Sequence, residues 1–309
     1  MKLLDKLEPL LLLLAVAAGL ALERSAPASF LARAFVGPFL TFMLLGLFWE
    51  IPVKDIRAAF GNVRFALSSV FVNFVWTPAF AWLLTRTFME SAPLMGLGFI
   101  LLLVTPCTDW YLVFTGMAKG NVKLSVSILP TNLILQIFLL PLYILLLSGN
   151  KVDVDMFSLG KSLALALIVP FVLDKALKRL FSNMAGPTSM MEKLFAKRQF
   201  VWLWLAILAM FASENIFGAG YPKIFAMIIV PIVIFFVVTI FFGQAVSKAM
   251  GFSREDGVSL RFTTLARNSP LALAFAQRAF PGQGEVLLPL IIGPLVELPL
   301  LALIAWLTL

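Results

Sequence analysis

The residues best suited to chemistry lie in the segment Thr105–Asp109 (TPCTD). This segment interrupts an apolar run from Leu94 to Met117. Proline lacks a backbone N–H and clashes with the preceding turn, so a helix that reaches Pro106 must break or kink there. Cys107 is the only cysteine of the chain, and Asp109 puts an ionisable group inside an apolar span, which is costly unless the group is paired or functional. A broken helix with such groups is typical of a transport site, because half-helix ends offer unpaired backbone groups.

A second candidate break carries a charge of the opposite sign. Ser269-Pro270 repeats the pattern of a hydroxyl residue before proline, and Arg267 stands two residues ahead of it. Ser can cap the free amides at a helix start, and Pro fits the first turn without losing a hydrogen bond. If the two breaks cross, Asp109 and Arg267 meet there. The pair then either holds the crossing together or binds a substrate or a proton, and removing one partner would leave a buried charge uncompensated.

Glu297 is the third candidate, in the segment Leu288–Pro299 (LPLIIGPLVELP). The prolines could leave nearby carbonyl groups unbonded, and burial away from water favours the protonated form of a carboxyl group. Such a group can exchange a proton across the membrane, or it can be a structural side chain bonded to a neighbouring helix. Because the chain has no histidine, a proton relay must use carboxyl groups, and we expect Glu297 and Asp109 to serve.

Cys107 is the candidate ligand for a soft substrate. In the first turn of a helix that starts at Pro106 the thiolate would be favoured, and a thiolate binds soft metals and metalloids. A single buried cysteine can also be a small apolar side chain of the core. Polar residues that could line the same cavity near the membrane midplane favour the binding role. They are Thr105, Thr108, Asn132, Gln136, Thr263, Thr264, Asn268 and Ser269.

The composition places these residues in an all-α membrane protein. Of the 309 residues, 61% are hydrophobic and 13% are charged, and the mean hydropathy is +1.00. A soluble domain of this length carries far more charge, and the alternation of a membrane β-barrel is absent. The net charge of +8 comes from basic residues in short loops, which indicates topology rather than nucleic-acid binding. With no histidine, one cysteine and no P-loop, we expect neither an enzyme nor a bound cofactor or metal.

Apolar segments of spanning length predict ten transmembrane helices. They are expected at 7–22, 34–49, 65–86, 93–118, 123–148, 157–180, 199–217, 222–249, 257–280 and 284–307. The first resembles a signal peptide, but we interpret it as a retained helix. Lys and Arg number 15 on the side of the N-terminus and 7 on the other side. We therefore expect a multi-pass plasma-membrane protein with both termini in the cytoplasm.

The two halves of the chain repeat each other on either side of the most basic loop. The breaks fall in spans four and nine, and the next span of each half carries matching prolines. Leu129-Pro130 and Leu140-Pro141-Leu142 correspond to Leu288-Pro289 and Leu298-Pro299-Leu300. We expect two inverted five-helix repeats: residues 1–180 hold the first repeat and span six, 181–198 form a basic cytoplasmic loop, and 199–309 hold the rest.

At these residues the chain resembles the arsenical-resistance efflux permeases, a branch of the bile acid:sodium symporter superfamily. The resemblance covers nearly the whole chain in span count and repeat plan, and its sharpest motifs are Pro106-Cys107-Thr108 and Val296-Glu297-Leu298-Pro299. It implies a panel domain of spans 1, 2, 6 and 7, and a core domain of spans 3–5 and 8–10 in which discontinuous helices 4 and 9 cross. It also implies efflux of arsenite by proton antiport, with Cys107 as the substrate ligand and Glu297 as the essential carboxyl group.

Three positions bear on how far that resemblance extends. Asp109 stands where arsenite permeases usually have a small or apolar residue. Thr263 and Arg267 stand where the bile acid branch has the acidic residue and the glutamine that hold sodium, whereas the family's asparagine is kept as Asn268. A cation at Arg267 disfavours sodium coupling by repulsion, and an Arg267–Asp109 pair could substitute for the ion. Arg267 could equally attract an anion such as a carboxylate or arsenate.

Three functions are therefore open. Proton-coupled export of neutral arsenite or antimonite predicts that Cys107 and Glu297 are required and that sodium is not. Transport of an organic anion of the bile acid type, sodium-independent or proton-coupled, predicts that Arg267 binds the anion and that Cys107→Ser stays active. A receptor or channel is disfavoured by the two broken helices and by the lack of a sizeable soluble domain.

The expected site has three parts. Cys107, Thr108, Arg267, Asn268 and Ser269 bind the substrate, Glu297 and Asp109 couple it to protons, and Pro106 and Pro270 break the crossing helices. The expected partners are a small-molecule or metalloid substrate, protons and the lipid bilayer, and the oligomeric state is left open.

Overall fold

The computed structural model describes residues 26–50, 62–108, 110–147, 169–180, 199–213 and 221–309, with isolated residues between 11 and 22 and between 157 and 165. These residues form helices and no strand, and one isolated antiparallel bridge joins Pro106 to Arg267. The predicted all-α class is confirmed for this part of the chain. Half of the predicted span 7–22 lies outside the described residues, as does most of the first half of span 157–180, and loop 181–198 lies wholly outside them.

Four helical stretches are long and apolar enough to cross a membrane. They are Val63–Phe88, Val122–Leu147, Ile224–Ala249 and Gly284–Thr308. The first contains α4 (Val63–Phe71), the π-helical turn η3 (Val72–Trp76) and α5 (Thr77–Phe88); the others are α8 (Val122–Leu147), most of α13 (Tyr221–Ala249) and α16 (Gly284–Thr308). Their bounds agree within two residues with the predicted spans 65–86, 123–148, 222–249 and 284–307. Multiple membrane spans are thereby confirmed.

Each of the two spans predicted to be broken consists of two shorter helices. Predicted span 93–118 is formed by α6 (Pro93–Leu103) and α7 (Trp110–Met117), and predicted span 257–280 by α14 (Arg254–Leu265) and α15 (Ser269–Ala279). The remaining helices are α2 (Ala26–Glu50), α10 (Val169–Leu180) and α12 (Gln199–Ser213). The count of ten spans and their inverted repeat stay predictions.

The helices belong to two compact units. Unit 1 comprises Met1–Ile51, Asp155–Tyr221 and Leu273–Leu287, and unit 2 comprises Pro52–Val154, Pro222–Ala272 and Leu288–Leu309. Unit 1 therefore holds α2, α10 and α12. Unit 2 holds α4 to α8, α14 and nearly all of α13, while α15 and α16 each contribute residues to both units.

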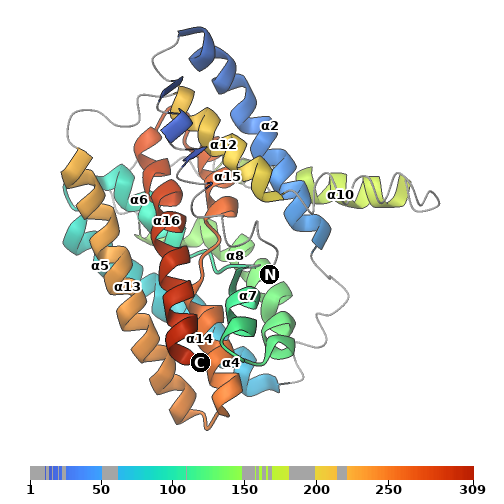
Figure 1. Cartoon of the computed structure of the whole chain (residues 1–309), viewed down its shortest axis with the longest axis vertical. Helices are drawn as coiled ribbons and strands as arrows, with labels where there is room; N and C mark the ends of the chain where they lie inside the picture. Colours follow the sequence, from blue (N-terminus) through green and yellow to red (C-terminus); the bar gives the residue numbers. More distant parts are fainter. Residues whose placement is uncertain are drawn as a thin grey trace. The chain divides into compact units, whose positions relative to one another are not determined.

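Unit 1 is organised around α2 and α12, which lie side by side (Figure 1). The ring of Trp202 on α12 lies 5.0 Å from the ring of Phe42 and 6.1 Å from that of Phe39, both on α2. Next to these rings, Leu40 and Leu203 are buried. Aromatic and aliphatic packing between these two helices therefore forms the core of this unit.

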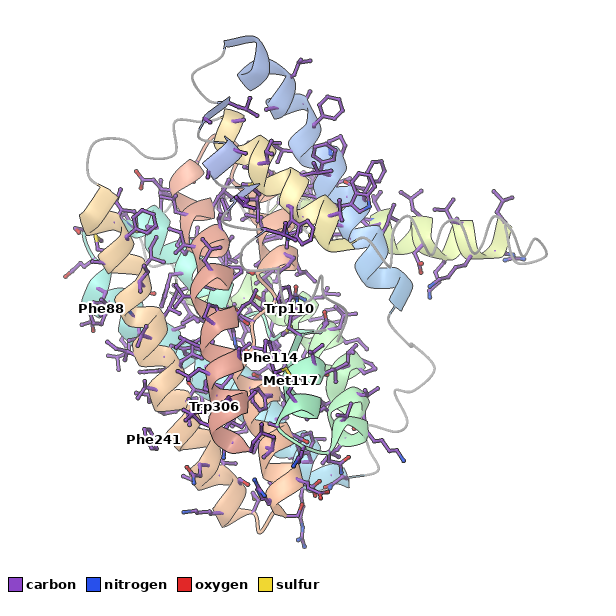
Figure 2. All side chains as sticks on the ribbon, in the orientation of Figure 1. Phe88, Trp110, Phe114, Met117, Phe241 and Trp306 are labelled. Carbon is purple, nitrogen blue, oxygen red and sulfur yellow. The ribbon has the colours of Figure 1, made fainter. Side chains whose placement is uncertain are left out.

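Unit 2 holds α6, α7, α14 and the first residues of α15, together with most of the long helices. The ring of Trp76 stacks on Phe242 of α13 with their centroids 3.8 Å apart, and the Tyr143 hydroxyl of α8 donates to the carbonyl of Phe74 at 2.6 Å. Phe241 on α13 and Trp306 on α16, labelled in Figure 2, are 66% and 68% exposed. Exposed apolar side chains of this size suit a surface that faces lipid.

Candidate functional site

The break after α6 is made by Thr105 and Pro106. The last amide of the helix, that of Val104, donates to the Ile100 carbonyl at 2.9 Å. The residue before a proline disfavours helical geometry, and Thr105 occupies that place. Its hydroxyl donates back to the Leu101 carbonyl at 2.9 Å, which satisfies a buried group that the broken helix leaves open.

This geometry corrects the prediction that a helix starts at Thr105-Pro106. The next helix, α7, begins only at Trp110, so Cys107 and Thr108 lie in non-helical backbone between the two half-helices. Cys107 is therefore not in a first helical turn, and the expected stabilisation of its thiolate by that turn does not apply. The error came from assigning Thr105 as a cap for the following helix, whereas its hydroxyl bonds to the preceding one.

The two breaks meet through their backbones inside unit 2. The Cys107 amide donates to the Ala266 carbonyl at 3.0 Å, and the Asn268 amide donates to the Thr105 carbonyl at 2.7 Å. These bonds flank the antiparallel bridge between Pro106 and Arg267. Buried backbone groups need hydrogen-bond partners, and here each non-helical segment supplies the partners of the other.

Asn268 connects the crossing to the start of α15. Its side-chain oxygen accepts from the Leu271 amide at 3.2 Å, and its side-chain nitrogen donates to the Thr108 hydroxyl at 3.3 Å. Asn268 is therefore the cap of α15, one residue ahead of the predicted Ser269, and Ser269 is buried as the first helical residue. Pro270 follows inside the first turn, where the missing N–H costs nothing.

Arg267 is enclosed by neutral oxygen atoms. Its side chain is 3% exposed. Its Nε donates to the Leu265 carbonyl at 3.1 Å and its Nη1 to the Leu103 carbonyl at 2.8 Å. Its Nη2 donates to Asn73 Oδ1 at 3.1 Å and also to the Thr264 carbonyl. The Phe235 ring covers the guanidinium at 5.3 Å, a cation–π distance.

Asn73 is a site residue that sequence reasoning missed. It lies in the π-helical turn η3, a type of turn that is frequent at functional sites. Its side-chain nitrogen donates to the Thr263 carbonyl at 3.3 Å, which turns its oxygen toward Arg267. The sequence did contain a signal for this site: two polar residues, Ser69 and Asn73, stand four residues apart within an apolar span.

Glu297 bonds to the main chain of Arg267. On α16, its Oε1 accepts from the Arg267 amide at 2.7 Å, and its side chain is 4% exposed. The prolines Pro294 and Pro299 stand on either side of it within the same helix. The carboxyl group is thereby attached to the crossing and removed from water, and its role in proton coupling stays a prediction.

Cys107 and Glu297 form hydrogen bonds with neighbouring residues of the second break. Cys107 is 2% exposed, and its amide bonds to the carbonyl of Ala266, the residue before Arg267. The main chain of Cys107 and the carboxyl group of Glu297 thus bond to two consecutive residues of the second break. Asp109 lies outside the described residues, so its pairing with Arg267 stays a prediction.

Other polar side chains of unit 2 are buried without a hydrogen-bond partner among the described residues. The amide nitrogen and oxygen of both Asn132 and Gln136, one turn apart on α8, belong to this group, as does the Thr263 hydroxyl. Thr264 instead donates to the Leu260 carbonyl at 2.9 Å. Within the described ranges, no group of three His, Cys, Asp or Glu side chains could hold a metal ion. The unpartnered carboxamides remain available to a polar ligand.

Comparison with known proteins agrees with a transport function. The profile of the Sodium Bile acid symporter family matches residues 37–218. A Bacillus subtilis protein named "Uncharacterized protein YbaS" is 29% identical over 290 residues, which cover 88% of this chain and 92% of that protein. The "Arsenical-resistance protein Acr3" of Corynebacterium glutamicum is 24% identical over 322 residues, covering 96% of this chain and 86% of that protein. Because the profile matches more than half of its residues, the chain belongs to the Sodium Bile acid symporter family.

Proposed function

We propose that the protein exports arsenite and antimonite in exchange for protons, as a secondary active transporter that works by alternating access. One observation carries the proposal: the sole cysteine and a buried carboxyl group are both bonded to the segment Ala266-Arg267. A soft ligand and a proton carrier are thereby held at one crossing of two broken helices. The similarity to an arsenical-resistance protein over 96% of the chain supports the same substrate.

Cys107 is the substrate ligand in this proposal. Arsenite enters the site as the uncharged trihydroxide, and the thiol displaces one hydroxyl group. An As–S bond forms, an S–H and an As–O bond break, and one water molecule leaves. The reverse reaction with water releases arsenite on the other side of the membrane. An uncharged substrate suits a site whose positive charge, Arg267, already has four protein oxygen partners.

Glu297 is the proton-coupling residue. Its carboxyl group is buried, and in either protonation state an oxygen can accept the Arg267 amide. A proton taken up from outside and released inside would therefore change the charge at the crossing without breaking this hydrogen bond. We place the protein in the plasma membrane with both termini in the cytoplasm, so that export moves the metalloid out of the cell.

The family description favours a second candidate, an organic-anion transporter. In that case the anion was expected to bind Arg267, but four of the five guanidinium N–H groups are engaged by protein oxygens. Asn132 and Gln136, whose carboxamides have no partner among the described residues, are better placed to recognise such a substrate.

The test is arsenite uptake into inverted membrane vesicles with an imposed proton gradient or sodium gradient. Wild-type protein should accumulate arsenite under the proton gradient alone, and Cys107→Ser and Glu297→Gln should abolish accumulation. Glu285→Gln is the matched control, because Glu285 lies on the same helix but is exposed, and it should behave as wild type. If arsenite does not move under either gradient, or if Cys107→Ser retains full uptake, the metalloid proposal is wrong, and Asn132 and Gln136 become the first targets of an anion screen.

A further inference from the structure

Four oxygen atoms of the chain surround the guanidinium of Arg267. We call the carbonyl oxygens of Leu103, Thr264 and Leu265, together with Asn73 Oδ1, the oxygen cage. All four accept hydrogen bonds from the guanidinium. The donor–acceptor distances to Leu103, Leu265 and Asn73 range from 2.8 to 3.1 Å. All four belong to unit 2.

The cage is built from the ends of two half-helices. Leu103 is the last residue of α6, and Thr264 and Leu265 are the last two residues of α14. The final carbonyls of a helix have no partner within it and carry the negative end of the helix dipole. Asn73 adds an amide oxygen, held in place by the bond of its nitrogen to the Thr263 carbonyl. Two negative helix ends and an amide oxygen therefore meet at the guanidinium of Arg267.

Uncharged oxygens at half-helix ends are the ligands that membrane transporters use for alkali-metal cations. Here a side chain of the chain itself supplies the cation. Glu297 bonds to the Arg267 amide rather than to its guanidinium, so the described hydrogen-bond partners of the guanidinium are helix-end carbonyls and an amide oxygen, while the carboxyl group of Glu297 lies close enough to act on its charge.

We propose that Arg267 is a tethered cation that replaces a bound alkali-metal ion at the crossing. The wild-type protein then needs no sodium to hold its two breaks together. Removing the side chain leaves an empty oxygen cage that a free cation can fill. The inference concerns the cation requirement of the fold, and it holds whichever substrate the protein carries.

The experiment uses thermal unfolding of the purified full-length protein in lipid nanodiscs. Each sample contains sodium, potassium, guanidinium or the bulky N-methylglucamine cation as chloride salts at the same ionic strength. Guanidinium is kept at ~20 mM, far below the concentrations at which it acts as a denaturant. The wild-type Tm should be the same in all four salts. Arg267→Ala should unfold at a lower temperature in N-methylglucamine and recover by at least ~4 °C, saturably, in guanidinium or an alkali-metal salt.

Two further variants separate this role from ordinary packing. Arg278→Ala removes a half-buried arginine whose guanidinium bonds to the Thr41 hydroxyl at 2.7 Å, and its Tm should not respond to the choice of cation. Arg267→Lys keeps the charge with fewer donors, so it should be less stable than wild type and still indifferent to sodium.

A result that contradicts the proposal can come from the wild-type protein or from Arg267→Ala. A wild-type Tm that rises in sodium but not in N-methylglucamine would mean that the protein binds a free ion in spite of Arg267. An Arg267→Ala protein that responds to no cation would mean that the cage does not need a charge. If Arg267→Ala does not fold, the wild-type titration and Arg267→Lys decide, because a sodium response in either contradicts the proposal. None of these outcomes depends on arsenite transport, so the two proposals fail separately.

Discussion

The carboxyl group of Glu297 and the guanidinium of Arg267 are both buried at the crossing, yet they have different partners. Glu297 accepts the Arg267 amide at 2.7 Å, while the guanidinium bonds to carbonyl oxygens and Asn73. The carboxyl group can therefore gain or lose a proton without removing the hydrogen bonds of the cation. At the scale of single residues, proton coupling and the integrity of the crossing are separable.

Substitutions of Glu297 should demonstrate that separation. Glu297→Gln keeps an oxygen that accepts the Arg267 amide, so we expect near-normal stability together with loss of gradient-driven transport. Glu297→Leu removes the acceptor as well, and a buried N–H without a partner should cost a further ~1–3 kcal/mol in the free energy of unfolding. Equilibrium unfolding in mixed micelles and vesicle uptake measure the two effects. Gradient-driven uptake by Glu297→Gln would refute the coupling role.

Asn73 should be a stabilising residue of the crossing. Asn73→Leu leaves a guanidinium N–H and the Thr263 carbonyl without their partner, and we expect a loss of ~1–3 kcal/mol in the free energy of unfolding. Asn73→Asp keeps an acceptor for Arg267 and should be better tolerated. Ser68→Ala is the control, because among the described residues the Ser68 hydroxyl bonds within its own helix, to the Arg64 carbonyl. Equal stability of Asn73→Leu and wild type would show that the contact is dispensable.

Among the elements, α16 lies close to α6 at Gly293. A Cβ atom at this position would stand 2.8 Å from both terminal carbons of Leu102, the residue before the cage residue Leu103. Leu102 is buried, so its side chain has little room to move. The small residue therefore allows the helix that carries Glu297 to approach the half-helix that ends at the crossing.

Gly293→Ala should destabilise the protein by ~1–3 kcal/mol through this overlap. Leu102→Ala alone should also destabilise it, by leaving a cavity. The double variant should lose less unfolding free energy than the two single variants together. The added Cβ atom fills the cavity, and the smaller side chain at 102 removes the overlap. Gly243→Ala on α13 is the matched control, since its new Cβ would meet Thr264 Oγ1 at an ordinary 3.7 Å. Strict additivity in the unfolding free energies would contradict the overlap.

Across the whole molecule, the described helices separate into two units, and the proposed site lies in only one of them. Cys107, Asn268 and Arg267 belong to unit 2, as do Asn73 and Glu297. Unit 2 also contains both pairs of half-helices up to Ala272. The panel and core domains, and the assignment of the substrate site to the core, stay predictions.

The predicted orientation of the molecule in the membrane rests on its basic residues and can be tested directly. In a Cys107→Ala background, Ser189→Cys in the basic loop should be labelled by a membrane-impermeant maleimide only in inverted vesicles. Ser148→Cys, at the outer end of the fifth predicted span, should be labelled in intact cells. The reverse pattern would show that the termini face outward.

Sequence alone determined the class of protein and the places where its helices are interrupted. Apolar runs of spanning length must form helices in lipid, and four of the predicted spans agree with the structure within two residues. Proline acts locally, so Pro106 and Pro270 located both breaks. The same local reasoning failed at Cys107, because the next helix begins at Trp110 and no propensity specified how long the break would be.

Only the tertiary structure decided what surrounds Arg267. Sequence reasoning paired Arg267 with Asp109, which lies outside the described residues, and it did not anticipate the backbone carbonyls or Asn73, which is 194 residues away along the chain. Backbone carbonyls are common to every residue, so sequence cannot indicate which of them will be free. They become free where a helix ends, and they become a site only where two helix ends are brought together by the packing of the unit.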